Sequence, residues 1–163
     1  MEIIRGMHNL KPRHHGSVVT IGNFDGVHRG HQAVLRQVRE KAVELNVQTM
    51  LICFEPQPKE YFDEFNAPAR LTRFREKVEL LSEHGVDLVL CLKFDERART
   101  QPAQDFMALL FGDIKASAIF VGDDFKFGHD RSGDFQMLRD AVKKTHTEVT
   151  NLYLSLIHIS EPT

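Results

Sequence analysis

Residues 21–32, which read IGNFDGVHRGHQ, constrain the fold of this chain more than any other stretch. They follow an apolar run at 18–21 that predicts a buried strand, and they precede residues 32–45, whose apolar positions recur at helical spacing. His28 and His31 are therefore expected where a strand turns into a helix N-terminus. Unpaired N–H groups and the positive end of the helix dipole attract phosphate there, and imidazoles can add further donors. The segment predicts a nucleotide phosphate site.

The rest of the chain alternates strand-length apolar runs with amphipathic segments. Strands are expected at 18–21, 49–54, 87–92 and 118–121, and helices at 32–45, 71–84, 101–110 and 134–144. Thr72 is placed to cap the second helix and Gly85 to end it. Continuous apolar strands between amphipathic helices predict an α/β fold, a doubly wound parallel sheet covered on both faces. Ligands bind beyond the carboxyl ends of such strands, where residues 22–31, 55–58 and 122–133 fall.

Composition narrows the class of protein. The chain has 163 residues, 42% of them hydrophobic, which is enough for one domain with its own core. A net charge of −2 without a Lys/Arg block favours no nucleic-acid partner. The longest apolar run is far too short for a membrane span, and the N-terminus lacks a signal-peptide core. Cys53 and Cys91 lie inside expected strands and predict buried free thiols, so we expect a soluble cytoplasmic protein.

The two histidines of the turn also fit a zinc pair or ordinary polar residues at a helix start. A zinc ion needs further ligands, and no His, Cys or Glu cluster lies nearby in the sequence. Gly22 and Gly26 would let the backbone approach a ligand or adopt positive φ, and Gly30 would leave space beside phosphates. A separate pair, His14 and His15, is expected to be solvated ahead of the first strand.

The motif at 22–31 resembles the signature of the nucleotidylyltransferase superfamily, whose short form is His-x-Gly-His. With Asn-Phe-Asp-Gly-Val before it, the motif is similar to that of the adenylyltransferase module of bacterial bifunctional FAD synthetases. Residues 53–58 (CFEPQP) resemble the flavin-side loop of that family, and residues 121–134 resemble its second nucleotide and flavin loop. The resemblance implies a Rossmann-like nucleotidylyltransferase (HxGH) fold over residues 1–149.

The resemblance also implies an activity, namely transfer of AMP from ATP to FMN to give FAD and pyrophosphate in flavin biosynthesis. FMN and ATP would be the substrates, and Mg²⁺ would arrive on the triphosphate, so no dedicated metal site is expected. His28 and His31 would be the catalytic hydrogen-bond donors. The implied ATP-binding residues are Gly22, Asn23, Phe24, Asp25, Gly30 and Gly122, together with the two histidines. The implied flavin-binding residues are Pro56, Pro58, Phe62, Asp124, Phe127 and Arg131.

Several of these residues have a structural alternative. Asn23 and Asp25 would equally suit a turn held by their own side chains. Phe62 would equally suit an ordinary loop anchor, and Arg131 a solvated loop residue.

The second loop carries two further open points. Asp124 stands where the family commonly has Asn, and a carboxylate there would repel phosphates unless it contacts Mg²⁺ or a ribose hydroxyl. Phe125 and Phe127 alternate, so we expect one to enter the core and the other to be free to stack on an aromatic ring.

The end of the chain departs from the family pattern. Residues 150–163 lack the expected Ser/Thr-rich motif ending in arginine and are expected to be a non-native or truncated tail, with a strand extension as the alternative. The riboflavin kinase domain that the resemblance implies after this module is expected to be missing here. We expect the fold to survive and catalysis to be impaired, because removing one positioned donor set costs about 10²–10³ in rate.

Two rival interpretations of the sequence remain, one with a different acceptor substrate and one in a different functional class. One is a different adenylyl- or cytidylyltransferase, with pantetheine phosphate, nicotinate nucleotide or a polyol phosphate as acceptor. The other is a module that binds flavin or nucleotide without catalysis.

Overall fold

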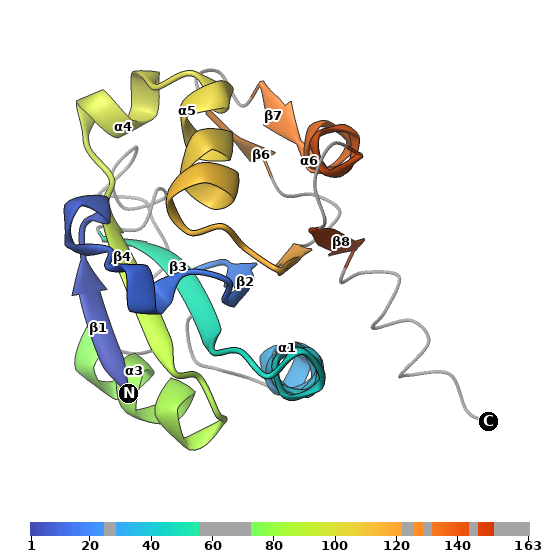
Figure 1. Ribbon diagram of the computed structural model, residues 1–163. Coiled ribbons are helices and arrows are strands. Elements are labelled where there is room, and N and C mark those ends of the chain that lie inside the picture. Colours follow the sequence, from blue (N-terminus) through green and yellow to red (C-terminus); the bar gives the residue numbers. More distant parts are fainter. Residues whose placement is uncertain (25–28, 56–72, 122–125, 129–131, 144–146, 152–163) are drawn as a thin grey trace.

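One parallel sheet forms the centre of the molecule (Figure 1). The computed structural model describes residues 1–24, 29–55, 73–121, 126–128, 132–143 and 147–151. Within these residues six strands pair in parallel, in the order β1-β4-β3-β2-β5-β8. Their bounds are β1 Glu2–Arg5, β2 Val18–Ile21, β3 Thr49–Glu55, β4 Leu88–Lys93, β5 Ala118–Val121 and β8 Glu148–Asn151. The predicted doubly wound α/β fold is confirmed.

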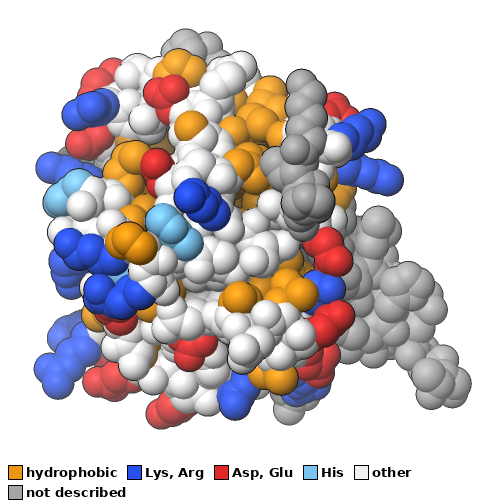
Figure 2. Space-filling view, in the orientation of Figure 1, with side chains coloured by type: hydrophobic (Ala, Val, Ile, Leu, Met, Phe, Trp, Pro, Cys, Tyr) orange, Lys and Arg blue, Asp and Glu red, His pale blue; other side chains and the backbone are white. Residues whose placement is uncertain are grey.

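Helices cover both faces of the sheet (Figure 1). Two of them, α1 (Arg29–Leu45) and α3 (Phe74–Glu83), lie on one face. On the other face lie α5 (Ala103–Ala108), its π-helical continuation η3 (Leu109–Asp113) and α6 (Phe135–Val142). Of the helices described, none is long and apolar enough to cross a membrane. Acidic and basic side chains are interspersed over the face shown in Figure 2, with apolar side chains showing between α5 and α6.

Short elements complete the connections. The short helix α4 (Glu96–Thr100) precedes α5, and the 3-10 turns η1 (Met7–Asn9) and η2 (Pro12–His14) lie between β1 and β2. A small antiparallel ribbon pairs β6 (Lys126–Phe127) with β7 (Gly133–Asp134) just before α6.

The chain connections place β3 on one side of β2 and β5 on the other. From β2 the chain passes through α1 to β3, which pairs with one side of β2. It returns from β4 through α4 and α5 to β5, which pairs with the other side of β2. This reversal is a topological switch point, and in open α/β sheets the crevice outside the carboxyl ends of the strands at that point is where ligands bind.

The alternation of side chains along each strand divides the core into two clusters. In β3, Met50 and Ile52 belong to the cluster that packs with α5, whereas Leu51 and Cys53 belong to the cluster that packs with α1 and α3. All four are fully buried. Because both faces are covered, the central strands read as unbroken apolar runs instead of alternating patterns.

The start of α3 differs from the prediction. Helix α3 begins at Phe74, with an extended Arg73 at its N-cap and no side-chain cap, so Thr72 as the capping residue is wrong. The carbonyl of Arg73 accepts the N–H of Lys77 at 2.9 Å, and packing of the Phe74 ring holds the first turn there. Gly85 follows the end of the helix with φ of 88°, and its predicted role in ending it is confirmed.

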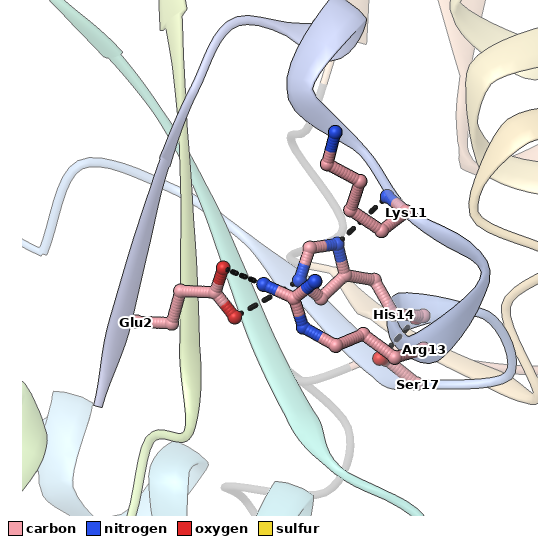
Figure 3. A network of polar contacts seen from close by, with 5 residues as sticks. All are labelled: Glu2, Lys11, Arg13, His14 and Ser17. Carbon is pink, nitrogen blue, oxygen red and sulfur yellow. Dashed lines mark hydrogen bonds and ion pairs between the residues drawn. The ribbon is translucent and has the colours of Figure 1, made fainter.

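A polar network, in which His14 and Ser17 are buried and Arg13 is exposed, holds the connection between β1 and β2 (Figure 3). Glu2 accepts hydrogen bonds from Arg13 Nη2 at 2.6 Å and from His14 Nε2 at 2.9 Å. The backbone N–H of Lys11 donates to His14 Nδ1 at 3.0 Å, which leaves the imidazole proton on Nε2. Ser17 Oγ donates to the carbonyl of His14 at 2.8 Å. His14 is 1% exposed, so the expectation that it is solvated is wrong.

Candidate active site

The turn after β2 is built around one glycine and one unusual backbone conformation. Gly22 donates its N–H to the carbonyl of Ile52 at 3.0 Å, which extends the pairing of β2 with β3. Phe24 adopts φ of 53°, rare for a bulky residue, and its side chain is buried. A Cβ on Gly22 would lie 2.9 Å from Cε1 of the Phe24 ring. The ring therefore folds back over a position that only glycine leaves open.

Phe24 in turn holds His31. Their rings stack with centroids 4.6 Å apart and planes 18° apart. His31 lies in the first turn of α1, directly after Gly30, and α1 is 17 residues long. The imidazole is therefore held at the positive end of a long helix, where N–H groups can donate to an anion.

Asn23 joins the ends of two strands. Its Oδ1 accepts a hydrogen bond from the backbone N–H of Phe54, near the end of β3, at 3.3 Å. The oxygen thus links the turn after β2 to the exit from β3, and the ATP-side role of Asn23 stays a prediction.

A row of phenylalanine rings crosses the carboxyl edge of the sheet. Phe54 packs edge-on against Phe94 at 5.8 Å between centroids and lies 6.4 Å from Phe106, which in turn lies 5.3 Å from Phe127. Phe127 is only 7% exposed and belongs to the core. Phe127 thus enters the core, which leaves little of its ring for a ligand, while Phe125 lies outside the described residues. The sequence analysis did not single out Phe94. Its position was a usable signal, because it directly follows β4, just as Phe54 lies near the end of β3.

A second group of side chains lies at the same end of β1, β3 and β4. Cys53 and Cys91 are opposite each other in the pairing of β3 with β4, and both are free and buried, as predicted. The hydrogen bond between the thiols, together with burial, raises the pKa of Cys53. The same hydrogen bond lowers the pKa of Cys91 to about 7, with the positive charges of Arg5 and Lys77 acting in the same direction. Lys77 itself is 1% exposed and pairs with Glu55.

The structure brings five of the predicted ATP-side residues together around the turn from β2 to α1: Gly22, Asn23, Phe24, Gly30 and His31. Eight other predicted site residues lie outside the described residues: Asp25, His28, Pro56, Pro58, Phe62, Gly122, Asp124 and Arg131. Within the described part of the chain, no group of three or more His, Cys, Asp or Glu residues could hold a metal ion.

A doubly wound parallel sheet with this strand-to-helix turn at its switch point defines an α/β domain of the nucleotidyltransferase type. Residues 10–159 match the FAD synthetase family, and the chain belongs to that family. The resemblance noted in the motifs is thereby confirmed.

Relatives of known name are about twice as long. The chain is 51% identical over 142 residues to a bifunctional riboflavin kinase/FMN adenylyltransferase of Pseudomonas fluorescens, covering 86% of this chain and 45% of that protein. It is 48% identical over 153 residues to the Escherichia coli K12 protein of the same name, covering 93% of this chain and 49% of the relative. The chain thus spans about half the length of these curated relatives.

A solved structure shares the fold. The crystal structure of a macrolide-efflux protein from Streptococcus pneumoniae superposes with a TM-score of 0.75 at 24% sequence identity, over 93% of this chain and 50% of that one. At this identity the likeness concerns the fold alone.

Proposed function

We propose that this chain is an FMN adenylyltransferase domain, which transfers AMP from ATP to FMN and releases pyrophosphate. Membership of the FAD synthetase family supports the proposal, as do the names of the relatives. The observation that carries it is the stack of Phe24 on His31, because it holds an imidazole at the N-terminus of α1 beside the switch point.

The reaction needs alignment and charge stabilisation more than covalent chemistry. A phosphate oxygen of FMN attacks the α-phosphorus of ATP, a new P–O bond forms, and the bond to the β-phosphate breaks with its electron pair leaving on pyrophosphate. The enzyme must bring two mutually repelling anions together and stabilise the charge that builds on the leaving group. His31 and the N–H groups of α1 donate hydrogen bonds to phosphate oxygens, and Mg²⁺ enters with ATP as part of the substrate.

The other assignments stay within the proposal. On the ATP side they are Gly22, Asn23, Phe24, Asp25, His28, Gly30 and Gly122. On the flavin side they are Pro56, Pro58, Phe62, Asp124 and Arg131, with the buried Phe127 supporting the flavin wall through Phe106. The longer protein would also carry a riboflavin kinase domain, in line with the names of the relatives. It would act in the cytoplasm, because the free thiols Cys53 and Cys91 fit a reducing compartment.

The direct test is formation of FAD and release of pyrophosphate from FMN, ATP and Mg²⁺. We expect His31→Ala to lower kcat by about 10²–10³ with a smaller effect on the KM for FMN, because the donor acts on developing charge. His15→Ala is the matched control, since that histidine is exposed and lies outside the site, and it should leave kcat unchanged. Unchanged turnover in His31→Ala would remove the role assigned to this residue.

Two other outcomes would replace the proposal. Pyrophosphate release with pantetheine phosphate, nicotinate nucleotide or a polyol phosphate, but not with FMN, would assign a different acceptor. Flavin or ATP binding without any pyrophosphate release would favour a non-catalytic binding module.

A further inference from the structure

We infer that Cys53 and Cys91 form an oxidant-sensitive thiol pair, in which a hydroperoxide oxidises Cys91 and Cys53 then closes a reversible intrachain disulfide. Neither cysteine is among the residues assigned to ATP or to flavin, so the inference does not depend on the proposed function. It concerns a modification site on β3 and β4, two neighbouring strands of the described sheet.

The register of the sheet brings the two cysteines together. Strands β3 and β4 pair in parallel with Cys53 directly opposite Cys91. Adjacent strands lie about 4.8 Å apart, which is inside the range of Cα separations that a disulfide bridges, about 4.4–6.8 Å. Both side chains belong to the core cluster that packs with α1 and α3, and a hydrogen bond already joins the thiols. A disulfide can therefore form without a change of strand register.

The surroundings of the two thiols give them different roles. The hydrogen bond with Cys53 lowers the pKa of Cys91 to about 7, with Arg5 and Lys77 acting in the same direction and burial and Glu55 opposing them. The same hydrogen bond and burial raise the pKa of Cys53. Because the thiolate is the reactive form, Cys91 is the nucleophile that meets the oxidant, and Cys53 is the thiol that resolves the product.

Access to the pair also favours Cys91. Its side chain is 7% exposed, whereas Cys53 is 0% exposed. Among the strands described, β1 lies at the edge of the sheet and pairs with β4 alone, with its last residue Arg5 opposite Cys91 (Figure 1). Only Ile4 of this strand is buried, and elements with few buried contacts open at low free energy. Local opening of β1 therefore admits a small peroxide to Cys91, while Cys53 lies one strand further in.

The chemistry balances with a hydroperoxide as the one co-reactant. The Cys91 thiolate attacks the distal peroxide oxygen, the O–O bond breaks, and the leaving oxygen takes up a proton to become an alcohol or water. The sulfur is thereby oxidised by two electrons to a sulfenic acid. The Cys53 sulfur then attacks it, an S–S bond forms, the S–O bond breaks, and hydroxide leaves as water with the Cys53 proton. A small thiol reverses the step by disulfide exchange.

The first test treats the folded wild-type chain with hydrogen peroxide near neutral pH, blocks the remaining thiols and maps the digest by mass spectrometry. We expect a chain that has lost two hydrogen atoms, a linked pair of peptides that contain Cys53 and Cys91, and full recovery of both thiols with dithiothreitol. Recovery of two unlinked thiols after exposure would show inert core cysteines and overturn the inference.

Two single variants test the assigned roles, with circular dichroism to verify that each is folded. In Cys53→Ala, Cys91 loses its resolving partner, so we expect its sulfenic acid to persist and to be trapped by dimedone. In the matched variant Cys91→Ala, we expect Cys53 to be trapped at least about tenfold more slowly, because it is more buried and its pKa is not lowered. Equal or faster trapping of Cys53 would overturn the assignment.

A surface variant tests the pair without changing the core. Arg5 is exposed, so Arg5→Gln should leave the fold intact and slow disulfide formation by about twofold, because the thiolate fraction of Cys91 falls. Arg75→Gln removes an equal charge from a side chain of α3 that is 92% exposed, and it should leave the rate unchanged. Equal rates in the two variants would overturn the assignment of Cys91 as the activated thiol.

Discussion

Gly22 and Phe24 depend on each other. The Phe24 ring occupies the space that a side chain at residue 22 would need, and in that position it stacks on His31. A positive φ at Phe24 is energetically unfavourable, and such backbone conformations persist where the surrounding packing holds them. The candidate catalytic imidazole is thus held by a ring that a single glycine makes room for.

Gly22→Ala is therefore expected to destabilise the protein by about 1–3 kcal/mol, the usual range for a side chain forced into a packed site. Urea unfolding of wild type and variant gives the difference. Gly112→Ala is the matched control: a Cβ there meets nothing within 4 Å, so we expect no loss of stability. Equal effects of the two substitutions would contradict the role of the Phe24 ring.

Single residues also show where sequence reasoning ends. The residue types of Asn23 and His14 show that both side chains can form hydrogen bonds, but the sequence does not show with which partners. Asn23 bonds to Phe54 and His14 to Glu2, each more than ten positions away in the chain. Side-chain partners at such separations follow from the path of the backbone, which composition and spacing do not contain.

At the scale of elements, the edge strand β1 is held in part by contacts with the segment between β1 and β2. Only Ile4 of its four residues is buried, so the strand lacks the continuous apolar run that marked the four predicted strands, and it went unpredicted. Glu2, at its first residue, holds η2 through Arg13 and His14 (Figure 3). The network thus ties an edge strand to the segment that leads into β2.

This network predicts a dependence of stability on pH. The hydrogen bond from His14, aided by Arg13, holds the pKa of Glu2 below its usual value of 4.5. A lowered folded-state pKa stabilises the fold fully above the ordinary value, and the contribution is lost as pH falls through the lower one. Glu2→Gln should therefore flatten the fall in unfolding free energy between about pH 6 and pH 3, measured by denaturant titration at each pH.

Arg13→Gln removes the lesser of the two interactions of Glu2 and should give an intermediate slope. Identical pH profiles for wild type and Glu2→Gln would contradict the role of the network.

Helix α3 shows a limit of periodicity. The spacing of Phe74, Val78 and Leu81 located the helix correctly, yet Lys77 is fully buried while Val78 is only partly so. A lysine stem is itself apolar and can cover a core, so its burial depends on whether a partner for the ammonium is at hand. Glu55, on another element, supplies that partner.

At the scale of the whole molecule, both core clusters share the same strands. Leu81 of α3 lies in one cluster and Leu110 of η3 in the other, and neither side chain is exposed. Because each central strand contributes alternate residues to both clusters, loss of packing on one face weakens the strands that support the other. The two faces should therefore unfold together.

We expect Leu81→Ala and Leu110→Ala each to lower the unfolding free energy by about 2–5 kcal/mol. In both variants, far-UV circular dichroism and the reactivity of the buried thiols Cys53 and Cys91 should report one coincident transition. The thiols are a convenient probe because the chain has no tryptophan. Two separated transitions would show that the faces unfold independently.

The amino-acid sequence by itself determined the α/β class and the place of the turn between β2 and α1. Unbroken apolar strands between amphipathic helices bury both faces only in a covered parallel sheet, and a strand followed by a glycine-rich turn and a helix is a local pattern. Tertiary structure alone decided the strand order, the edge strands β1 and β8, and the burial of His14 and Lys77. Those features depend on contacts between residues far apart in the chain, whose energies appear only once the backbone has brought them together.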